Sequence, residues 1–278
     1  LQMQISALDY NSYVGVFGVG RITRGKLVPN TQVVIVGSEG DTRKGRILQV
    51  MGHMGLERVD VPSAEAGDIV CITGIEGLNI SDTLCDPACP EALPPLSVDE
   101  PTVSMTFQVN DSPFAGKEGK YVTTRNIKDR LERELIHNVA LRVEPGDTPD
   151  KFKVSGRGEL HLSVLIESMR REGFELGVSR PEVIRKEVDG VMHEPYEQLV
   201  IDCEEQHQGS VMEELGLRRA ELENMVPDGK GRVRLEFIIP ARGLIGFRSL
   251  LMTMTSGGGI LTHVFDHYGP VKNAEIAS

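Results

Sequence analysis

The chain is poor in cysteine and contains no long hydrophobic run. Four cysteines in 278 residues are too few for a disulfide framework, so we expect reduced thiols. The longest apolar runs, such as Val33–Val36 and Phe237–Ile239, fall far short of the roughly 20 residues that a membrane-spanning helix needs. No signal peptide opens the sequence. These absences argue against a secreted or membrane protein, and we expect a cytoplasmic one.

Motifs for catalysis and for metal binding are also missing. The sequence has no G-x-S-x-G elbow, no H-E-x-x-H helix and no G-x-G-x-x-G turn that opens a helix. Cys85 and Cys89 form a C-x3-C pair, but no second Cys or His pair follows at zinc-finger spacing. His263 and His267 would lie about 13 Å apart in the strand that we expect there. We therefore predict no catalytic residue, no metal site and no cofactor in these residues.

The net charge of −11 argues at first against a nucleic-acid partner, because phosphate binding requires clustered Lys and Arg. The distribution of charge matters more than the sum. Residues 97–181 carry 13 basic and 14 acidic groups, whereas residues 182–278 carry 10 and 16. Locally basic surface can therefore meet RNA while the remaining acidic surface limits non-specific binding.

The first third consists of short β-rich runs separated by turns. Strands are expected at Val33–Val36, Gly45–Val50 and Asp68–Thr73, and closely spaced glycines suit the tight corners of a small barrel. Four prolines within Cys85–Val98 prevent regular structure, so we interpret that segment as a closing linker. The sequence predicts a β-barrel over residues 1–96.

The middle third changes to a mixed α and β pattern. Apolar residues repeat every four positions over 127–135 and at i, i+3, i+4, i+7 over 162–169, which predicts two amphipathic helices. The expected strands are Val103–Val109, Ala140–Glu144, Phe152–Ser155 and Phe174–Val178. The order β-α-β-β-α-β predicts a ferredoxin-like domain over residues 97–181.

The last third, residues 182–278, repeats this pattern. The expected strands are Tyr196–Cys203, Arg232–Ile239 and Ile260–Phe265. A charged helix is expected over Ser210–Leu222, and a second helix begins after Pro240 with Leu244, Phe247, Leu251 and Met254 as its buried seam. The predicted fold class is multi-domain β and α+β: a β-barrel followed by two ferredoxin-like (βαββαβ) domains.

Both ferredoxin-like units carry an Arg-Gly step where a strand passes into the second helix. These steps are Arg157-Gly158 and Arg242-Gly243. A cation beside free backbone N–H groups suits an anion such as phosphate. The alternative is a tight turn whose glycine only relieves backbone sterics. We expect Arg242 to project opposite the apolar seam of its helix, so that packing gives it no reason to be basic.

Several segments resemble the translational GTPases. GRITRGKL at Gly20–Leu27, followed by AGDIV at Ala66–Val70, is similar to their second, β-barrel domain. SGRGELHL at Ser155–Leu162 resembles the signature of their third domain. The resemblance covers nearly the whole chain.

Within that superfamily the final third resembles the BipA/TypA family. The segments concerned are QHQGSV at Gln206–Val211, the stretch Asn224–Arg234, and RGLIGFR at Arg242–Arg248. Elongation factor G is the nearest alternative, but it inserts a further domain between its ferredoxin-like units, and here only Ser179–Pro195 intervenes. The resemblance thus favours BipA/TypA, with the β-barrel as domain II and the later units as domains III and V.

The family begins with a GTP-binding domain whose phosphate loop follows G-x4-G-K-[S/T]. No such string occurs in these residues. Gly116–Lys120 comes nearest, but it lacks both the spacing and the Ser or Thr for magnesium, and we interpret it as a surface loop. The chain starts at Leu1 rather than Met, so we expect a piece of a longer protein. GTP and Mg would bind in the missing domain, and the family's own C-terminal domain would follow Ser278.

The resemblance implies a ribosome-binding fragment that acts in translation or ribosome assembly under stress, without catalysis of its own. The implied partners are rRNA, ribosomal proteins and the GTPase domain in cis, with no membrane. The barrel would lie against the small subunit, and the last unit would approach large-subunit RNA. Our candidates for rRNA binding are Arg242, Arg248, Lys230, Arg232 and Arg157.

Two other classes of function stay open from the sequence. Paired ferredoxin-like domains can bind a small effector at their interface, which would make this a ligand-sensing regulatory protein. An enzyme whose site uses no known motif is the remaining possibility.

Overall fold

The computed structural model describes residues 1–272 and contains two compact units. The first unit comprises Leu1–Val98 and Asp129–Val139. The second comprises Asp99–Lys128 and the chain from Ala140 onward. The domain limits proposed from the sequence, at residues 96 and 181, stay predictions.

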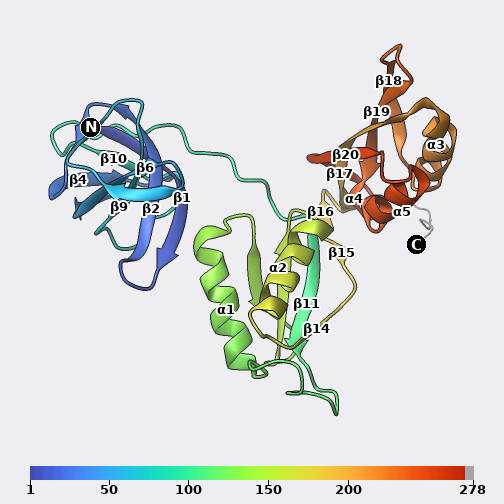
Figure 1. Ribbon diagram of the computed structural model, residues 1–278, viewed down its shortest axis with the longest axis horizontal. Helices are drawn as coiled ribbons and strands as arrows, with labels where there is room; N and C mark the ends of the chain where they lie inside the picture. Colours follow the sequence, from blue (N-terminus) through green and yellow to red (C-terminus); the bar gives the residue numbers. More distant parts are fainter. Residues whose placement is uncertain (273–278) are drawn as a thin grey trace. The chain divides into compact units, whose positions relative to one another are not determined.

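The first unit contains an antiparallel sheet, whose strands are drawn in blue to cyan in Figure 1. Its strand order is β5-β4-β10-β1-β2-β9-β6-β7. Its strands are β1 (Gln2–Asn11), β2 (Gly15–Arg24), β4 (Thr31–Val36), β5 (Thr42–Ile47), β6 (Gln49–Met54), β7 (Glu57–Asp60), β9 (Ile69–Thr73) and β10 (Thr83–Cys85), and β3 (Lys26–Leu27) pairs with β8 (Ala64–Glu65). Side chains such as Met3, Ile35 and Ile72 meet in one core without exposed surface, so the sheet forms the predicted barrel. A side chain at Gly20 would lie 2.0 Å from the Gln4 carbonyl oxygen, so only glycine fits at this point of the β1–β2 pairing.

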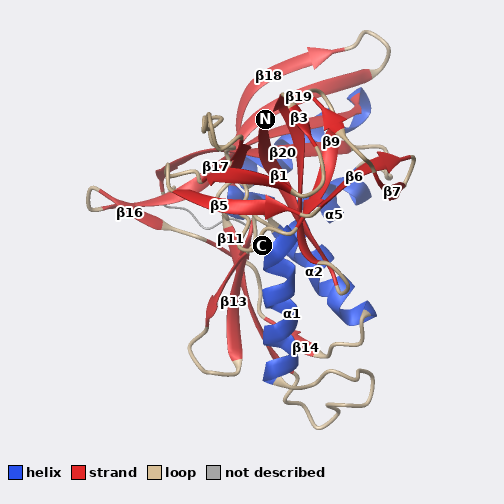
Figure 2. Ribbon diagram, turned by 90° about the vertical axis from the view of Figure 1, so that its left-hand side faces the viewer, coloured by secondary structure: helices blue, strands red, loops and turns tan. Residues whose placement is uncertain are grey.

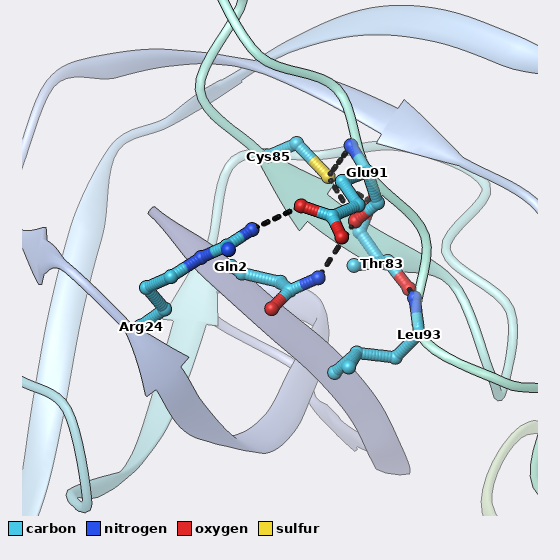
Figure 3. Close-up of polar contacts among 6 residues, drawn as sticks. All are labelled: Gln2, Arg24, Thr83, Cys85, Glu91 and Leu93. Atoms are coloured by element: carbon cyan, nitrogen blue, oxygen red, sulfur yellow. Dashed lines mark hydrogen bonds and ion pairs between the residues drawn. The ribbon is translucent and has the colours of Figure 1, made fainter.

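Residues 86–96 have no regular structure, as the prolines predict, but they are not a free linker. We call them the strap, because they lie along β1 and β10 and bind there through polar contacts (Figure 3). The contacts include Gln2 Nε2 to the Glu91 carbonyl (3.0 Å), the Glu91 N–H to Cys85 Sγ (3.4 Å), the Leu93 N–H to Thr83 Oγ1 (3.1 Å), and an ion pair between Arg24 and Glu91. The strap is therefore part of the barrel fold.

The second unit begins with the first ferredoxin-like module, residues 103–178. Its elements are β11 (Val103–Val109), α1 (Thr124–His137), β12 (Arg142–Pro145), β13 (Lys151–Gly156), α2 (Glu159–Arg171) and β14 (Leu176–Val178). The sheet order β12-β13-β11-β14 is that of the ferredoxin-like fold. Helix α2 packs against the sheet through the predicted seam of Leu162, Leu165, Ile166 and Met169, all of which are buried. Helix α1 begins in the second unit and ends in the first.

The second ferredoxin-like module covers residues 191–270 (Figure 2). Its elements are β17 (Val191–Glu204), α3 (Gln208–Leu217), β18 (Glu221–Pro227), β19 (Arg232–Pro240), α4 (Ala241–Leu244), α5 (Phe247–Met254) and β20 (Ile260–Pro270). The order β20-β17-β19-β18 repeats the topology of the first module, which confirms the predicted fold class. Two short strands join the modules: β15 (Glu182–Val183) pairs with β11, and β16 (Lys186–Val188) pairs with β17.

Two expectations for the second module are wrong in detail. Helix α3 ends at Leu217 rather than Leu222, and the next residues form the edge strand β18. The single helix expected after Pro240 is split into α4 and α5 by Gly246, whose φ of 74° lies in the left-handed region. In the barrel, the expected strand Gly45–Val50 likewise divides at Leu48 into β5 and β6.

Candidate nucleic-acid interface

The structure gives Arg242 a packing role, contrary to our expectation. Its Nε donates a hydrogen bond to Oε2 of Glu194 at 2.7 Å, and its Nη2 donates to the Lys272 carbonyl at 2.6 Å. Glu194 has no exposed surface, and the Arg242 side chain is only 16% exposed. A buried carboxylate needs a cation, so Arg242 is basic because Glu194 is buried. The idea that packing gives Arg242 no reason to be basic is wrong.

Arg232 is also engaged within the protein. At the start of β19, its Nε donates to Oδ1 of Asp202 at 2.6 Å, and its Nη2 donates to the Gly258 carbonyl at 3.1 Å. These contacts tie β19 to β17 and to the loop after α5. About a third of the side chain is exposed, and Asp202 already neutralises its charge.

Lys230 occupies the tip of the β18–β19 hairpin. Oδ1 of Asp228 accepts the backbone N–H groups of Lys230 (2.6 Å) and Arg232 (3.0 Å), and these two bonds lower the pKa of Asp228. Gly229 and Gly231 supply the positive φ angles of the turn. The Lys230 side chain is exposed and has no polar partner within residues 1–272, so the turn fixes its backbone and leaves its ammonium available.

Arg157 and Arg248 are exposed, and neither side chain has a polar partner in the described part of the chain. Arg157 precedes α2, where its N–H donates to Nδ1 of His161 at 3.2 Å. Arg248 lies in the first turn of α5. It lines a cleft of about 180 Å³ between the two modules, to which Gly158 also contributes. The structure therefore places the two Arg-Gly steps in different settings, and only the first leaves its arginine exposed.

The same cleft carries acidic groups. Oε2 of Glu159 accepts the Gly246 N–H at 2.9 Å, which links α2 of one module to the turn between α4 and α5 of the other. Glu197 is 4% exposed, and its Oε1 lies 3.0 Å from Nδ1 of His263. The cleft therefore has mixed charge, and its exposed cation is Arg248. Of the five candidates, Arg157, Lys230 and Arg248 offer accessible cations, whereas Arg232 and Arg242 serve the fold.

No group of three or more His, Cys, Asp or Glu within residues 1–272 is placed to hold a metal ion. No helix in that part of the chain is both long and apolar enough to cross a membrane.

Known protein families match both ends of the chain. The family described as Elongation factor Tu domain 2 matches residues 15–85, and the family described as Elongation factor G C-terminus matches residues 191–277. A crystal structure of a Thermus thermophilus protein shares the fold, with a TM-score of 0.59 at 16% identity, over 98% of this chain and 56% of that one.

Curated relatives match over nearly the whole chain. Proteins named Large ribosomal subunit assembly factor BipA are 66% identical in Salmonella typhimurium and in Escherichia coli K12, and 54% identical in Buchnera aphidicola. Each alignment covers 99% of this chain but only 45–46% of the relative, so the chain spans about half the length of these proteins. None of these names favours the ligand-sensing alternative. The chain belongs to the BipA/TypA family of translational GTPases.

Proposed function

We propose that this chain is the ribosome-binding part of a cytoplasmic BipA-type factor that assists assembly of the large ribosomal subunit under stress. The observation that carries the proposal is the 66% identity, over 99% of the chain, to relatives named as large-subunit assembly factors. Its partners would be rRNA and ribosomal proteins. GTP hydrolysis is assigned to a domain outside these 278 residues, because they contain no phosphate-loop motif.

Three exposed cations support RNA binding by the second unit. Arg157, Lys230 and Arg248 each lack a polar side-chain partner within residues 1–272. An unpaired exposed cation can neutralise a phosphate without first breaking an internal ion pair, and it releases a condensed counterion when it does so. Arg232 is a weaker candidate because Asp202 already neutralises it. Arg242 is not a suitable test of RNA binding, because its replacement would leave Glu194 buried without a cation.

The test is co-sedimentation of the full chain with purified large ribosomal subunits over a series of salt concentrations. A variant with Arg157→Glu, Lys230→Glu and Arg248→Glu should bind less at low salt, while its circular dichroism spectrum stays that of the wild type. Each lost phosphate contact should reduce the slope of log affinity against log salt by roughly one unit.

The matched control carries the same charge change on the barrel. Lys26, Lys44 and Arg46 are exposed and have no polar side-chain partner in the described residues. Their replacement by Glu should leave large-subunit binding near the wild-type level. Equal losses in both triple variants would show that net charge alone matters. A wild-type chain that does not pellet with ribosomal subunits would contradict the proposed function itself.

A further inference from the structure

One carboxylate holds the middle of the loop between β11 and α1, Asn110–Tyr121. Glu175, just before β14, accepts the backbone N–H groups of Gly116 (2.8 Å), Glu118 (2.7 Å) and Gly119 (2.6 Å). These bonds lower the pKa of Glu175 to about 2. The Asn110 amide donates to the same carboxylate at 3.3 Å. A loop with this many bonds to one anchor keeps its shape without a ligand.

The far end of the loop is fixed as well. The N–H of Lys120 donates to the Gly173 carbonyl at 2.8 Å, and the N–H of Glu175 donates to the Tyr121 carbonyl at 3.1 Å. The Tyr121 and Phe174 rings pack with centroids 4.7 Å apart. A side chain at Gly119 would lie 2.7 Å from the Gly173 carbonyl oxygen, so the close approach of the two segments requires glycine there.

This ordered loop presents an aromatic ring to solvent. Phe114 is 65% exposed, and the ammonium of Lys117 lies 4.6 Å from the centre of its ring. Arg170 of α2 lies on the same concavity, which has a volume of about 610 Å³ and also includes Glu118, Phe174 and Glu175. That volume is within the range of roughly 300–1,000 Å³ of small-ligand sites. Lys117 and Arg170 are exposed and have no acidic partner within the described residues.

We propose that this concavity binds an unpaired RNA base, which stacks on Phe114 while Lys117 and Arg170 contact its phosphates. Every nucleobase offers a flat face for stacking on an aromatic ring, and adjacent cations bind the backbone of the same nucleotide. Four charged residues line the concavity, Lys117 and Arg170 with Glu118 and Glu175, and neither cation has an ion-pair partner in the described residues. This favours a charged occupant over an apolar protein segment, because the charged groups would lose water in a dry interface without gaining a partner. The inference rests on the proposed function, and it adds a contact in the first ferredoxin-like module.

The loop also accounts for a sequence feature that the family resemblance leaves unused. Gly116–Lys120 resembles part of a phosphate loop, but it lacks the spacing for a nucleotide. Three of its N–H groups point at an anion, as in a phosphate loop, but that anion is the Glu175 side chain. An external phosphate therefore cannot use these donors and must bind the exposed side chains instead.

The test uses the full chain and a fluorescent single-stranded oligouridylate, with a double-stranded RNA as second probe. Phe114→Ala should weaken binding of the single strand about tenfold, and Phe114→Trp should restore it. Lys117→Gln should reduce the salt slope by roughly 0.7. Glu118→Gln, which removes a negative charge from the concavity, should strengthen binding. The control is Tyr13→Ala, which removes an aromatic ring of 94% exposure from the barrel and should have no effect.

The outcomes separate this inference from the proposed function. Equal affinity of Phe114→Ala and wild type for the single strand, or equal losses on single- and double-stranded RNA, would overturn base stacking at Phe114. If Phe114→Ala lowers pelleting with ribosomal subunits but not oligouridylate binding, the loop contacts a ribosomal protein, and the RNA assignment is wrong. If wild type pellets with large subunits and Phe114→Ala does so equally, the proposed function stands without this contact.

Discussion

The guanidinium of Arg242 and the carboxylate of Glu194 form an ion pair at 2.7 Å, and Glu194 has no exposed surface. Both oxygens of Glu194 are used, because the N–H of Lys272 donates to Oε1 at 3.2 Å. The pair therefore links α4, β17 and the chain that follows β20. A basic residue within a segment typical of the family can thus be required for folding rather than for RNA binding.

Removing the cation should destabilise the second ferredoxin-like module. In Arg242→Met the Glu194 carboxylate stays buried without its partner, which should cost about 3 kcal/mol in the free energy of unfolding. Hydrogen exchange of the β17 and β20 amides measures this locally, so that unfolding of the barrel does not interfere.

Two further variants test whether the unpaired Glu194 carboxylate causes the loss of stability in Arg242→Met. Arg248→Met removes an exposed arginine from the neighbouring helix and should change stability by less than about 0.5 kcal/mol. The double variant Arg242→Met with Glu194→Gln should be more stable than Arg242→Met alone, because the buried charge is gone. If Arg242→Met were no less stable than Arg248→Met, the ion pair would not contribute to folding.

The loop Asn110–Tyr121 should loosen in acid. The pKa of Glu175 is lowered to about 2 by the N–H groups of Gly116, Gly119 and Glu118, so its contribution to stability is complete above its ordinary pKa. It should be lost as pH falls from about 4.5 toward about 2. Amide exchange of Gly116 and Gly119, followed over this range by NMR, measures the loss.

Glu175→Ala should show the loosened loop already at neutral pH and no further loss in acid. The control is Glu167→Gln, which removes an exposed ion pair with Arg171 on α2. It should leave the loop amides as they are in the wild type. Acid loosening of equal size in the Glu175→Ala variant would assign the effect to another group.

Local periodicity predicts the parts of the fold that are half buried. The seam of α2 and the alternation of β19 are visible in the sequence because each has one buried face. Strand β18 was missed because all seven of its residues are exposed, so its sequence carries no alternation. The split between α4 and α5 depends on one glycine inside an otherwise continuous apolar pattern.

The candidate site was less predictable, because its contacts are distant in sequence. Arg242 pairs with a residue 48 positions away, and Glu175 binds N–H groups 56–59 positions away. The sequence does not show which backbone N–H groups lie near a given acid, so nothing in it singles out Glu175. Lys230 was a candidate from the sequence, and the structure places it in a turn between Gly229 and Gly231 with its side chain exposed.

Gly246 should be required for its backbone conformation alone. An added Cβ there would meet no atom within 4 Å, but φ is 74°. Gly246→Ala should therefore cost about 1 kcal/mol in the stability of the second module. The matched control is Gly216→Ala in α3, which also has open space but no positive φ and should stabilise by about 0.5 kcal/mol. Thermal unfolding compares the two, and equal effects would show that backbone strain is unimportant at Gly246.

The strap should open more often when its contact with Thr83 is removed. Thr83 has no exposed surface, and its hydroxyl is the acceptor for the Leu93 N–H at 3.1 Å. Thr83→Val keeps the shape but leaves that N–H unsatisfied, which should cost about 1 kcal/mol and open the strap about fivefold more often. A glutamate-specific protease that cleaves after Glu91 measures the opening.

The control is Thr73→Val, which removes another buried hydroxyl of the barrel, bonded to Gln49, without touching the strap. Faster cleavage in Thr83→Val than in Thr73→Val supports a bound strap, whereas equal cleavage in both variants and in the wild type means that residues 86–96 are a free linker.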